Sequence, residues 1–230
     1  MFAGEQGILK ANENWYSKAL STFQRGDFEV NNNILNWEKG KWLNPPLSVK
    51  QEGSRLKVVP EKGKDFWKKT LYGFEFEDGA ALLTDWQTDK AVEVSFLLTT
   101  FTELYDQAGI LLYHGPEQWI KAGIEINDGI PQLSAVVTDG YSDWSLTAVP
   151  EWNGEEVTIR ASVMKDAVII RARTEQHAWR TIRVARFPYL SGNQAGPFTC
   201  SPTRDGLEVT FTRWAFAEQD RDLHTDPPVE

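Results

Sequence analysis

The chain has 230 residues, of which 41% are hydrophobic and 25% charged, a composition that excludes general disorder and collagen-like repetition. This length fits a single all-β domain spanning residues 1–230, because sandwiches and barrels of about 200–250 residues fold as one unit. The net charge of −9 excludes nucleic acid and anionic membranes as expected partners, since both bind clustered Lys and Arg.

Residues 1–27 precede the strand-like part of the chain. We expect them to cover an edge of the domain, as irregular chain or with one short helix around residues 11–23. They lack the basic and long apolar segments of a signal peptide, and no apolar run approaches the ~18 residues of a membrane span. The single cysteine, Cys200, excludes an internal disulfide and fits a reducing compartment. We therefore expect a cytoplasmic protein.

Strand patterns dominate from about residue 55. Short alternating or β-branched runs recur at the ~8–12-residue spacing of sandwiches, and turn pairs such as Asp78-Gly79 and Asp139-Gly140 separate them. The pattern predicts an all-β fold, a two-sheet antiparallel β-sandwich with hairpin and Greek-key connections. The predicted strands are 55–59, 73–76, 80–86, 91–99, 107–113, 119–126, 131–138, 143–148, 157–162, 167–174, 179–187, 196–201 and 207–216.

Two charged stretches receive structural interpretations. The basic run over residues 171–186 alternates arginines, Arg171 and Arg173 among them, with apolar residues, so we interpret it as the solvated face of strands. The segment 218–230 carries Asp220, Asp222 and Asp226 before two prolines, and we expect it to be a frayed acidic tail.

The strand at 119–126 carries the most informative pattern. Alternation places Trp119, Lys121 and Glu125 on one face, with Gly123 between the charged pair, and the isoleucines on the opposite, core face. An aromatic ring beside a cation and a carboxylate is the usual equipment of a sheet that binds a sugar or another partly apolar small molecule. The alternative is a salt bridge between Lys121 and Glu125 on an outer surface, and the glycines at 109 and 123 could equally mark β-bulges.

The neighbouring segments supply further candidates. Asp106 begins the strand at 107–113 and would lie near Glu125 if the two strands are adjacent, which would provide the carboxylate pair of a glycoside hydrolase. His114 lies in a loop where it could act as a general base. Asp143, between Ser142 and Trp144, is more typical of a turn-capping carboxylate than of a catalytic one.

The sequence offers no signal for a cofactor or a metal. The three histidines have no ligand spacing, and neither a phosphate-binding glycine loop nor a nucleophile motif occurs. We expect neither a cofactor nor a bound metal. Ten tryptophans are more than a core of this size needs, and they indicate that some aromatic side chains line a groove or pocket.

Several motifs occur in the order found in a known family. They are WLNPP at 42–46, DFWKKT at 65–70, YDQAG at 105–109, WIKAGIE at 119–125, DG at 128–129 and SDWS at 142–145. In these motifs, which cover roughly residues 28–215, the chain resembles the regulation-of-enolase proteins of the concanavalin-A-like lectin/glucanase superfamily. The resemblance implies a two-sheet jelly roll with a concave face and a cytoplasmic location. The Glu-x-Asp-x-x-Glu strand of the superfamily's glucanases is absent.

Three functions remain open from the sequence. The leading hypothesis is a binding module that holds a carbohydrate or similar small molecule on the concave sheet. The second is an enzyme, a glycoside hydrolase, lyase or isomerase, with Glu125 or Asp106 as acid or base and Lys121 or His114 as partner. The third is a regulatory protein that acts through a protein partner. The ligand-binding residues predicted for the first are Trp119, Lys121, Glu125, Tyr105, Gln107, Trp144 and Asp143.

Overall fold

The computed structural model describes residues 34–189 and 191–228, and these form the second of two compact units, which starts at residue 33. The predicted N-terminal segment 1–27 lies outside the described residues. Within the described part, no helix is long and apolar enough to cross a membrane.

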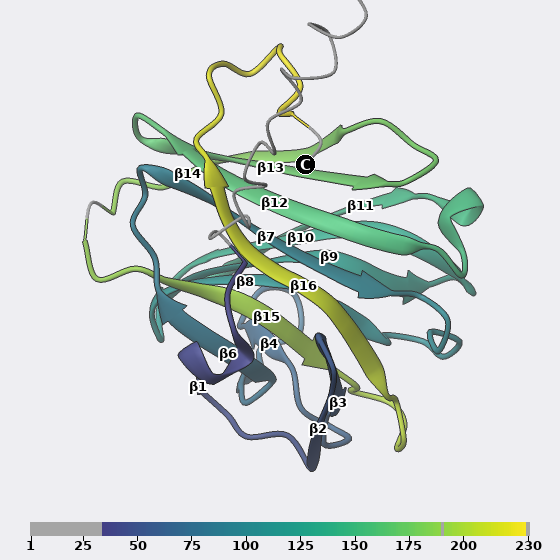
Figure 1. The fold of residues 1–230 in the computed structure, drawn as a ribbon. Coiled ribbons are helices and arrows are strands. Elements are labelled where there is room, and N and C mark those ends of the chain that lie inside the picture. Colours follow the sequence, from purple (N-terminus) through teal and green to yellow (C-terminus); the bar gives the residue numbers. More distant parts are fainter. Residues whose placement is uncertain (1–33, 190, 229–230) are drawn as a thin grey trace, which may run out of the picture. The chain divides into compact units, whose positions relative to one another are not determined.

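Two seven-stranded sheets, which we call sheet I and sheet II, make up the body of the fold, and every pairing within them is antiparallel. Figure 1 shows the long strands of one sheet lying face to face with those of the other. In spatial order, sheet I contains β1 (Lys41–Trp42), β6 (Ala80–Asp85), β15 (Gln194–Cys200), β8 (Gln107–Gly115), β9 (Gln118–Asn127), β10 (Ile130–Asp139) and β11 (Ser142–Ala148). Sheet II contains β14 (Arg180–Arg186), β13 (Ala167–Thr174), β12 (Glu156–Met164), β7 (Lys90–Leu97), β16 (Val209–Glu218), β3 (Arg55–Val59) and β2 (Ser48–Glu52).

In the described part of the chain, two 3-10 helices and one short hairpin lie outside the two sheets. The 3-10 helices η1 (Trp37–Lys39) and η2 (Pro150–Trp152) each bury a tryptophan. Strands β4 (Phe66–Lys68) and β5 (Glu75–Glu77) pair only with each other, and we call residues 66–77 the β4–β5 hairpin.

The all-β, two-sheet prediction is confirmed, and every predicted strand range corresponds to a strand. The sequence reading missed β1, β2 and β4. Strand β2 is exposed along its whole length, so it has no alternation of buried and exposed residues. Strand β4 has three residues and all of them are buried, which leaves no period to detect.

The main core lies between the sheets, where apolar side chains from both inner faces meet. Strand β9 contributes its even-numbered residues, Ile120, Ala122, Ile124 and Ile126, as alternation predicts. A second apolar cluster occupies the opposite, outer face of sheet I, beneath the β4–β5 hairpin. It contains Phe66, Trp67, Ala81, Leu83, Leu111, Trp119, Val136, Phe198 and Cys200. Sheet I is therefore covered on both faces where the hairpin crosses it.

Gly109 and Gly123 face each other across β8 and β9, and the strand register runs without interruption through this pair. The irregularity in the β8–β9 pairing comes later, between Tyr113 and Gly115, so these two glycines do not mark a bulge. A Cβ at either position would lie 2.0–2.1 Å from a backbone carbonyl oxygen of the other strand. The glycines therefore allow the close approach of the two strands that form the middle of sheet I.

The C-terminal segment after β16 packs against the outer face of sheet II instead of fraying. Asp220 is buried, and its carboxylate accepts hydrogen bonds from Arg160 Nε at 2.8 Å and Arg171 Nε at 3.1 Å. Arg171 also donates to the backbone carbonyl of Leu223 at 2.8 Å. The expectation of a frayed tail is therefore wrong, and so is that of a solvated Arg171, because the two features pair with each other.

Candidate functional site

A cavity of about 380 Å³ lies between the β4–β5 hairpin and the outer face of sheet I. We call it the hairpin cavity. Its volume falls near the lower end of the ~300–1,000 Å³ range of small-molecule pockets. Polar side chains form its floor, namely Asp65, Gln107, Lys121 and Glu125, and aromatic rings form its walls, namely Trp67, Tyr72, Phe74, Phe76, Tyr105 and Trp144.

Lys121 is the centre of the floor. Its Nζ donates to Asp65 Oδ1 at 2.5 Å and to Gln107 Oε1 at 2.8 Å, and its side chain is buried. Burial by itself would lower the pKa of Lys121, but the neighbouring carboxylate of Asp65 raises it above its usual value. Lys121 therefore stays protonated and holds Asp65 in an ion pair.

Glu125 lies on the same strand face two positions beyond Gly123, opposite Gln107 of β8. Its Oε2 accepts a hydrogen bond from Ser134 Oγ of β10 at 3.2 Å, and no other partner is found among the described residues. Burial raises the pKa of Glu125 to about 7, because the opposing effects of Lys121 and Ser134 do not compensate for the loss of water and the negative charge of Asp65 adds to the rise. A carboxyl group with this pKa exchanges a proton near neutral pH.

The aromatic walls come from both the hairpin and sheet I. Tyr72 and Phe74 stack with their ring centroids 5.2 Å apart and their planes within 6°. Trp67 meets Trp144 of β11 edge to face at 6.1 Å. The indole Nε1 of Trp144 donates to Ser134 Oγ at 3.2 Å, so the walls and the floor share one hydrogen-bond chain.

Three residues around this cavity have a strained backbone. Lys69 and Leu71 in the hairpin and Tyr105 before β8 have φ near +60°, a conformation that residues with a side chain rarely adopt. Tyr105 is itself a wall residue. Lys69 and Leu71 belong to the hairpin turn that also contains Tyr72. Strain of this kind costs about 1–3 kcal/mol per residue and is typical of functional sites.

The predicted residues Gln107, Lys121, Glu125, Tyr105 and Trp144 all line the hairpin cavity. Trp119 does not. It lies on the predicted face of β9, but the hairpin covers it, and its ring packs against Phe66 with centroids 5.6 Å apart. Trp119 therefore belongs to the second apolar cluster and is no stacking surface for a ligand.

Asp106 has a different role from the one expected. Strands β8 and β9 are adjacent, as the carboxylate-pair hypothesis required, yet the side chain of Asp106 is buried and both of its oxygens are bound. Arg204 Nε donates to Oδ1 and Arg204 Nη2 to Oδ2, each at 2.8 Å, and two backbone amides donate to Oδ2. The geometry is that of a loop anchor, and Asp106 does not line the hairpin cavity.

His114 and Asp143 also lie outside the cavity lining, and the expectation that His114 lies in a loop is wrong, because it belongs to the end of β8. His114 stacks on Tyr189 with ring centroids 4.2 Å apart, and its Nδ1 is 3.2 Å from Asn193 Oδ1. Asp143 is exposed and accepts a hydrogen bond from Arg183 Nη2 at 2.6 Å. Neither side chain is brought together with Glu125.

The sequence reading missed Asp65 and the hairpin aromatics as site residues. Asp65 is the direct partner of Lys121, although 56 positions separate them in the chain. A usable signal was present, since Trp67, Tyr72, Phe74 and Phe76 crowd aromatic residues into one short segment. A segment this short cannot bury so many aromatic rings by itself. Such a segment is expected to pack its rings against another part of the protein.

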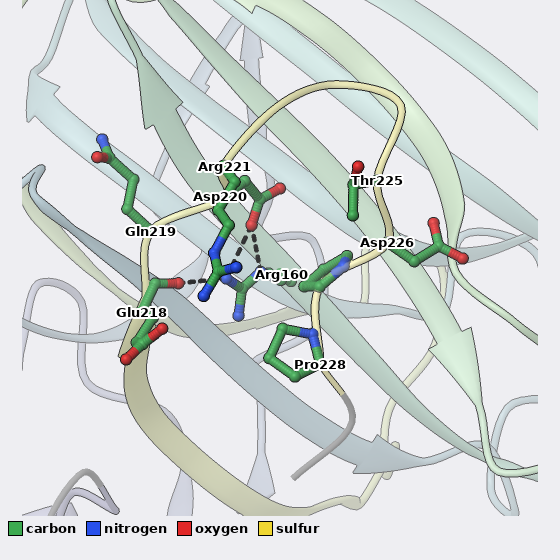
Figure 2. Close-up of a pocket in the computed structure, with 9 residues that line it drawn as sticks. Arg160, Glu218, Gln219, Asp220, Arg221, Thr225, Asp226 and Pro228 are labelled. Atoms are coloured by element: carbon green, nitrogen blue, oxygen red, sulfur yellow. Dashed lines mark hydrogen bonds and ion pairs between the residues drawn. The ribbon is translucent and has the colours of Figure 1, made fainter.

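A second cavity, of about 240 Å³, lies beside the C-terminal segment on sheet II. Figure 2 shows Arg160 between the backbone carbonyl of Glu218 and the carboxylate of Asp220. Arg160 Nη1 also donates to Glu93 Oε1 at 2.7 Å, so each nitrogen of this guanidinium has a protein partner. The arrangement is that of a structural ion network. Among the described residues, no three His, Cys, Asp or Glu side chains are grouped so that they could hold a metal ion.

The comparisons with known proteins assign the family. Residues 42–219 match the model of the family described as "Protein of unknown function (DUF1349)". This chain belongs to that family. It is 38% identical over 177 residues to Regulation of enolase protein 1 of Saccharomyces cerevisiae, covering 77% of this chain and 88% of the yeast protein.

Solved structures agree on the fold. A protein from Saccharomyces cerevisiae, described as functionally unknown, superposes with a TM-score of 0.73 at 35% identity, over 80% of this chain and 98% of that one. A xylan β-1,4-xylosidase from Bacillus halodurans superposes with a TM-score of 0.63 at 14% identity, over 83% of this chain and 40% of that one. SCLam, a non-specific endo-β-1,3(4)-glucanase, superposes with a TM-score of 0.52 at 15% identity, over 80% and 86%. At these identities the two glycosidases show only that the β-sandwich fold is shared.

Proposed function

We propose that this protein binds a carbohydrate or a sugar-sized polar molecule in the hairpin cavity. The observation that carries the proposal is a buried polar floor of Gln107, Lys121 and Glu125 beneath a wall of aromatic rings. Aromatic rings stack on the apolar faces of sugar rings, and a few directed polar groups recognise the hydroxyls. Because Cys200 is buried as a free thiol, we place this activity in the cytoplasm, where thiols stay reduced.

Burial of the floor residues supports a ligand role over an ordinary surface ion pair. A buried charge is costly unless it is paired, and a buried carboxyl with one weak hydrogen bond is incompletely satisfied. Glu125 is in this position, since its Oε1 has no partner among the described residues. A ligand hydroxyl that enters the cavity would supply the missing hydrogen bond.

The test is a thermal-shift screen against neutral monosaccharides, disaccharides and sugar acids, with Glu125→Gln and the exposed, non-lining Asp143→Asn as variants. A ligand at 100 times its Kd stabilises the native state by about 2.7 kcal/mol, which raises the Tm of a protein of this size by roughly 5–10 °C. We expect such a shift in the wild type and in Asp143→Asn, and a much smaller one in Glu125→Gln. A wild type that responds to none of these compounds would contradict the proposal.

A regulatory role through a protein partner is the second candidate. The relative named Regulation of enolase protein 1 suggests it, and the hairpin exposes Leu71 and Tyr72 beside the cavity mouth. If a partner docks there, the immobilised full chain should capture that partner. The Leu71→Ser variant should fail to capture it, whereas the Val184→Ser variant, changed at an exposed position of β14, should capture it as the wild type does. Capture by Leu71→Ser at the wild-type level would exclude this surface.

A further inference from the structure

The floor of the hairpin cavity contains two carboxyl groups in different environments. Asp65 Oδ1 accepts from Lys121 Nζ at 2.5 Å and from the Phe66 amide at 2.7 Å, so this carboxyl group is paired with a cation. Within residues 34–189 and 191–228, Glu125 contacts no cation directly and has one hydrogen bond, from Ser134. A pair of carboxyl groups whose environments differ in this way is the usual basis for assigning one as acid and the other as base.

The two groups come from different elements and both line the same cavity. Asp65 directly precedes β4 at the base of the hairpin, and Glu125 projects from β9 in the middle of sheet I. Ser134 holds Glu125 Oε2 and is itself held by Trp144 Nε1 at 3.2 Å, which leaves Glu125 Oε1 free for a ligand. A ring bound between the aromatic walls would meet both carboxyl groups.

The charge of the floor selects the kind of chemistry. Asp65 and Lys121 form an ion pair, so the floor is neutral whenever Glu125 carries its proton. Glycoside hydrolysis passes through a cation-like sugar that a negative carboxylate stabilises. Here the positive charge of Lys121 offsets the negative charge of Asp65, so the cavity offers no such stabilisation. A reaction that only moves protons on and off a sugar needs no net charge in the site.

We propose that the hairpin cavity interconverts the two anomers of a reducing monosaccharide, with the Glu125 carboxyl as proton donor and the Asp65 carboxylate as proton acceptor. This inference rests on the proposed function, because the sugar must bind in this cavity. The cavity volume of about 380 Å³ favours a single sugar over a polysaccharide chain.

The reaction balances without a co-reactant. Glu125 gives its proton to the ring oxygen while Asp65 takes the proton of the anomeric hydroxyl, and the bond between the anomeric carbon and the ring oxygen breaks to give the open-chain aldehyde. Rotation about the adjacent carbon–carbon bond exposes the other face of the carbonyl. The new hydroxyl adds to that face, Glu125 regains its proton, and Asp65 returns its proton to the anomeric oxygen.

The experiment measures anomer exchange by NMR and polarimetry, with D-glucose, D-galactose, D-mannose and D-xylose as probes. The wild type should accelerate exchange of at least one sugar in proportion to protein concentration. Because positioned acid–base groups contribute about 10²–10⁴-fold, Glu125→Gln and Asp65→Asn should each reduce the added rate by at least about 100-fold. Asp143→Asn, outside the cavity lining, should retain it.

The outcomes separate this inference from the proposed function. Glu125→Gln keeps the shape of the side chain, so the test does not depend on Asp65→Asn, whose loss of the Lys121 ion pair could unfold it. A wild type that is stabilised by one of these sugars yet leaves its exchange rate unchanged would overturn the inference and leave the binding proposal intact. A Glu125→Gln protein as active as the wild type would overturn it equally, and the absence of both binding and acceleration would overturn both proposals.

Discussion

At the scale of single residues, Glu125 is the group whose environment departs most from that of an ordinary surface carboxylate. Lys121 from the same strand, Asp65 from the segment before β4 and Tyr105 from the loop before β8 are the titratable groups that face it. Burial raises the pKa of Glu125 from 4.5 to about 7. The folded protein therefore keeps a proton on Glu125 over a pH range in which the unfolded chain has released it.

This proton predicts how stability depends on pH. The free energy of unfolding should decrease as pH rises from about 4.5 to about 7, since the native state binds the extra proton there, by up to about 3 kcal/mol in total. Glu125→Gln cannot ionise, so it should be more stable than the wild type at pH 8 by up to that amount and nearly equal to it at pH 5. Urea unfolding of the wild type and of Glu125→Gln at pH 5 and pH 8 measures these differences in stability. Glu61→Gln, at an exposed site, is the control, and a Glu125→Gln protein that is less stable at pH 8 would show that Glu125 is ionised and well paired in the fold.

The same residues show how far a single sequence predicts a site. Alternation along β9 correctly placed Lys121 and Glu125 on one face because the side-chain period of a strand is two. It could not reveal what covers that face, so Trp119 was expected to be a ligand platform although the hairpin buries it. Asp65 escaped notice because its position depends on a contact between segments far apart in the chain.

At the scale of elements, the β4–β5 hairpin converts an open sheet face into a cavity. Lys68 attaches it to sheet I, since its amide donates to Ser142 Oγ of β11 at 2.8 Å and its Nζ binds Glu117, which lies between β8 and β9. The same Nζ binds Glu77 of β5 at 2.8 Å, within the hairpin. Long strands of alternating residues were predicted well, but a hairpin with three residues in each strand has too short a pattern to be assigned to a sheet. The element that completes the site is therefore the one that the sequence predicts least.

Tyr72 and Tyr141 offer a matched test of the hairpin wall. Tyr72 lines the cavity and is 51% exposed, whereas Tyr141 is 64% exposed and does not line it. Tyr72→Ala should weaken the binding of the best sugar in the screen about tenfold, because a lost aromatic contact costs roughly 0.5–1.5 kcal/mol beyond its buried area. Calorimetric titration should find Tyr141→Ala unchanged, and both variants should melt close to the wild type, as exposed substitutions do. Equal affinities for Tyr72→Ala and the wild type would remove the hairpin from the binding site.

At the scale of the whole molecule, the two sheets have covered outer faces of different character. The hairpin cavity on sheet I contains the incompletely satisfied Glu125, while the outer face of sheet II carries a network of paired arginines and carboxylates. Glu93, Arg160 and Asp220 form the middle of that second network. Asp220 comes from the C-terminal segment, and its hydrogen bonds to Arg160 and Arg171 hold that segment on β12 and β13 (Figure 1, Figure 2).

The network predicts a large difference between two aspartates of this segment. Asp220 is buried between Arg160 and Arg171, whereas the side chain of Asp226 is 57% exposed and reaches Arg171 only at 3.5 Å. Asp220→Asn leaves two buried guanidinium groups without their shared charge, so it should lower the free energy of unfolding by about 3 kcal/mol, as the loss of one partner from a buried ion pair does. Asp226→Asn should lower it by less than about 1 kcal/mol, because exposed pairs contribute little. Chemical denaturation of both variants measures the difference. Equal stabilities would mean that the C-terminal segment is not held on sheet II through Asp220, because the Asp220 carboxylate is buried only when that segment is docked on the sheet.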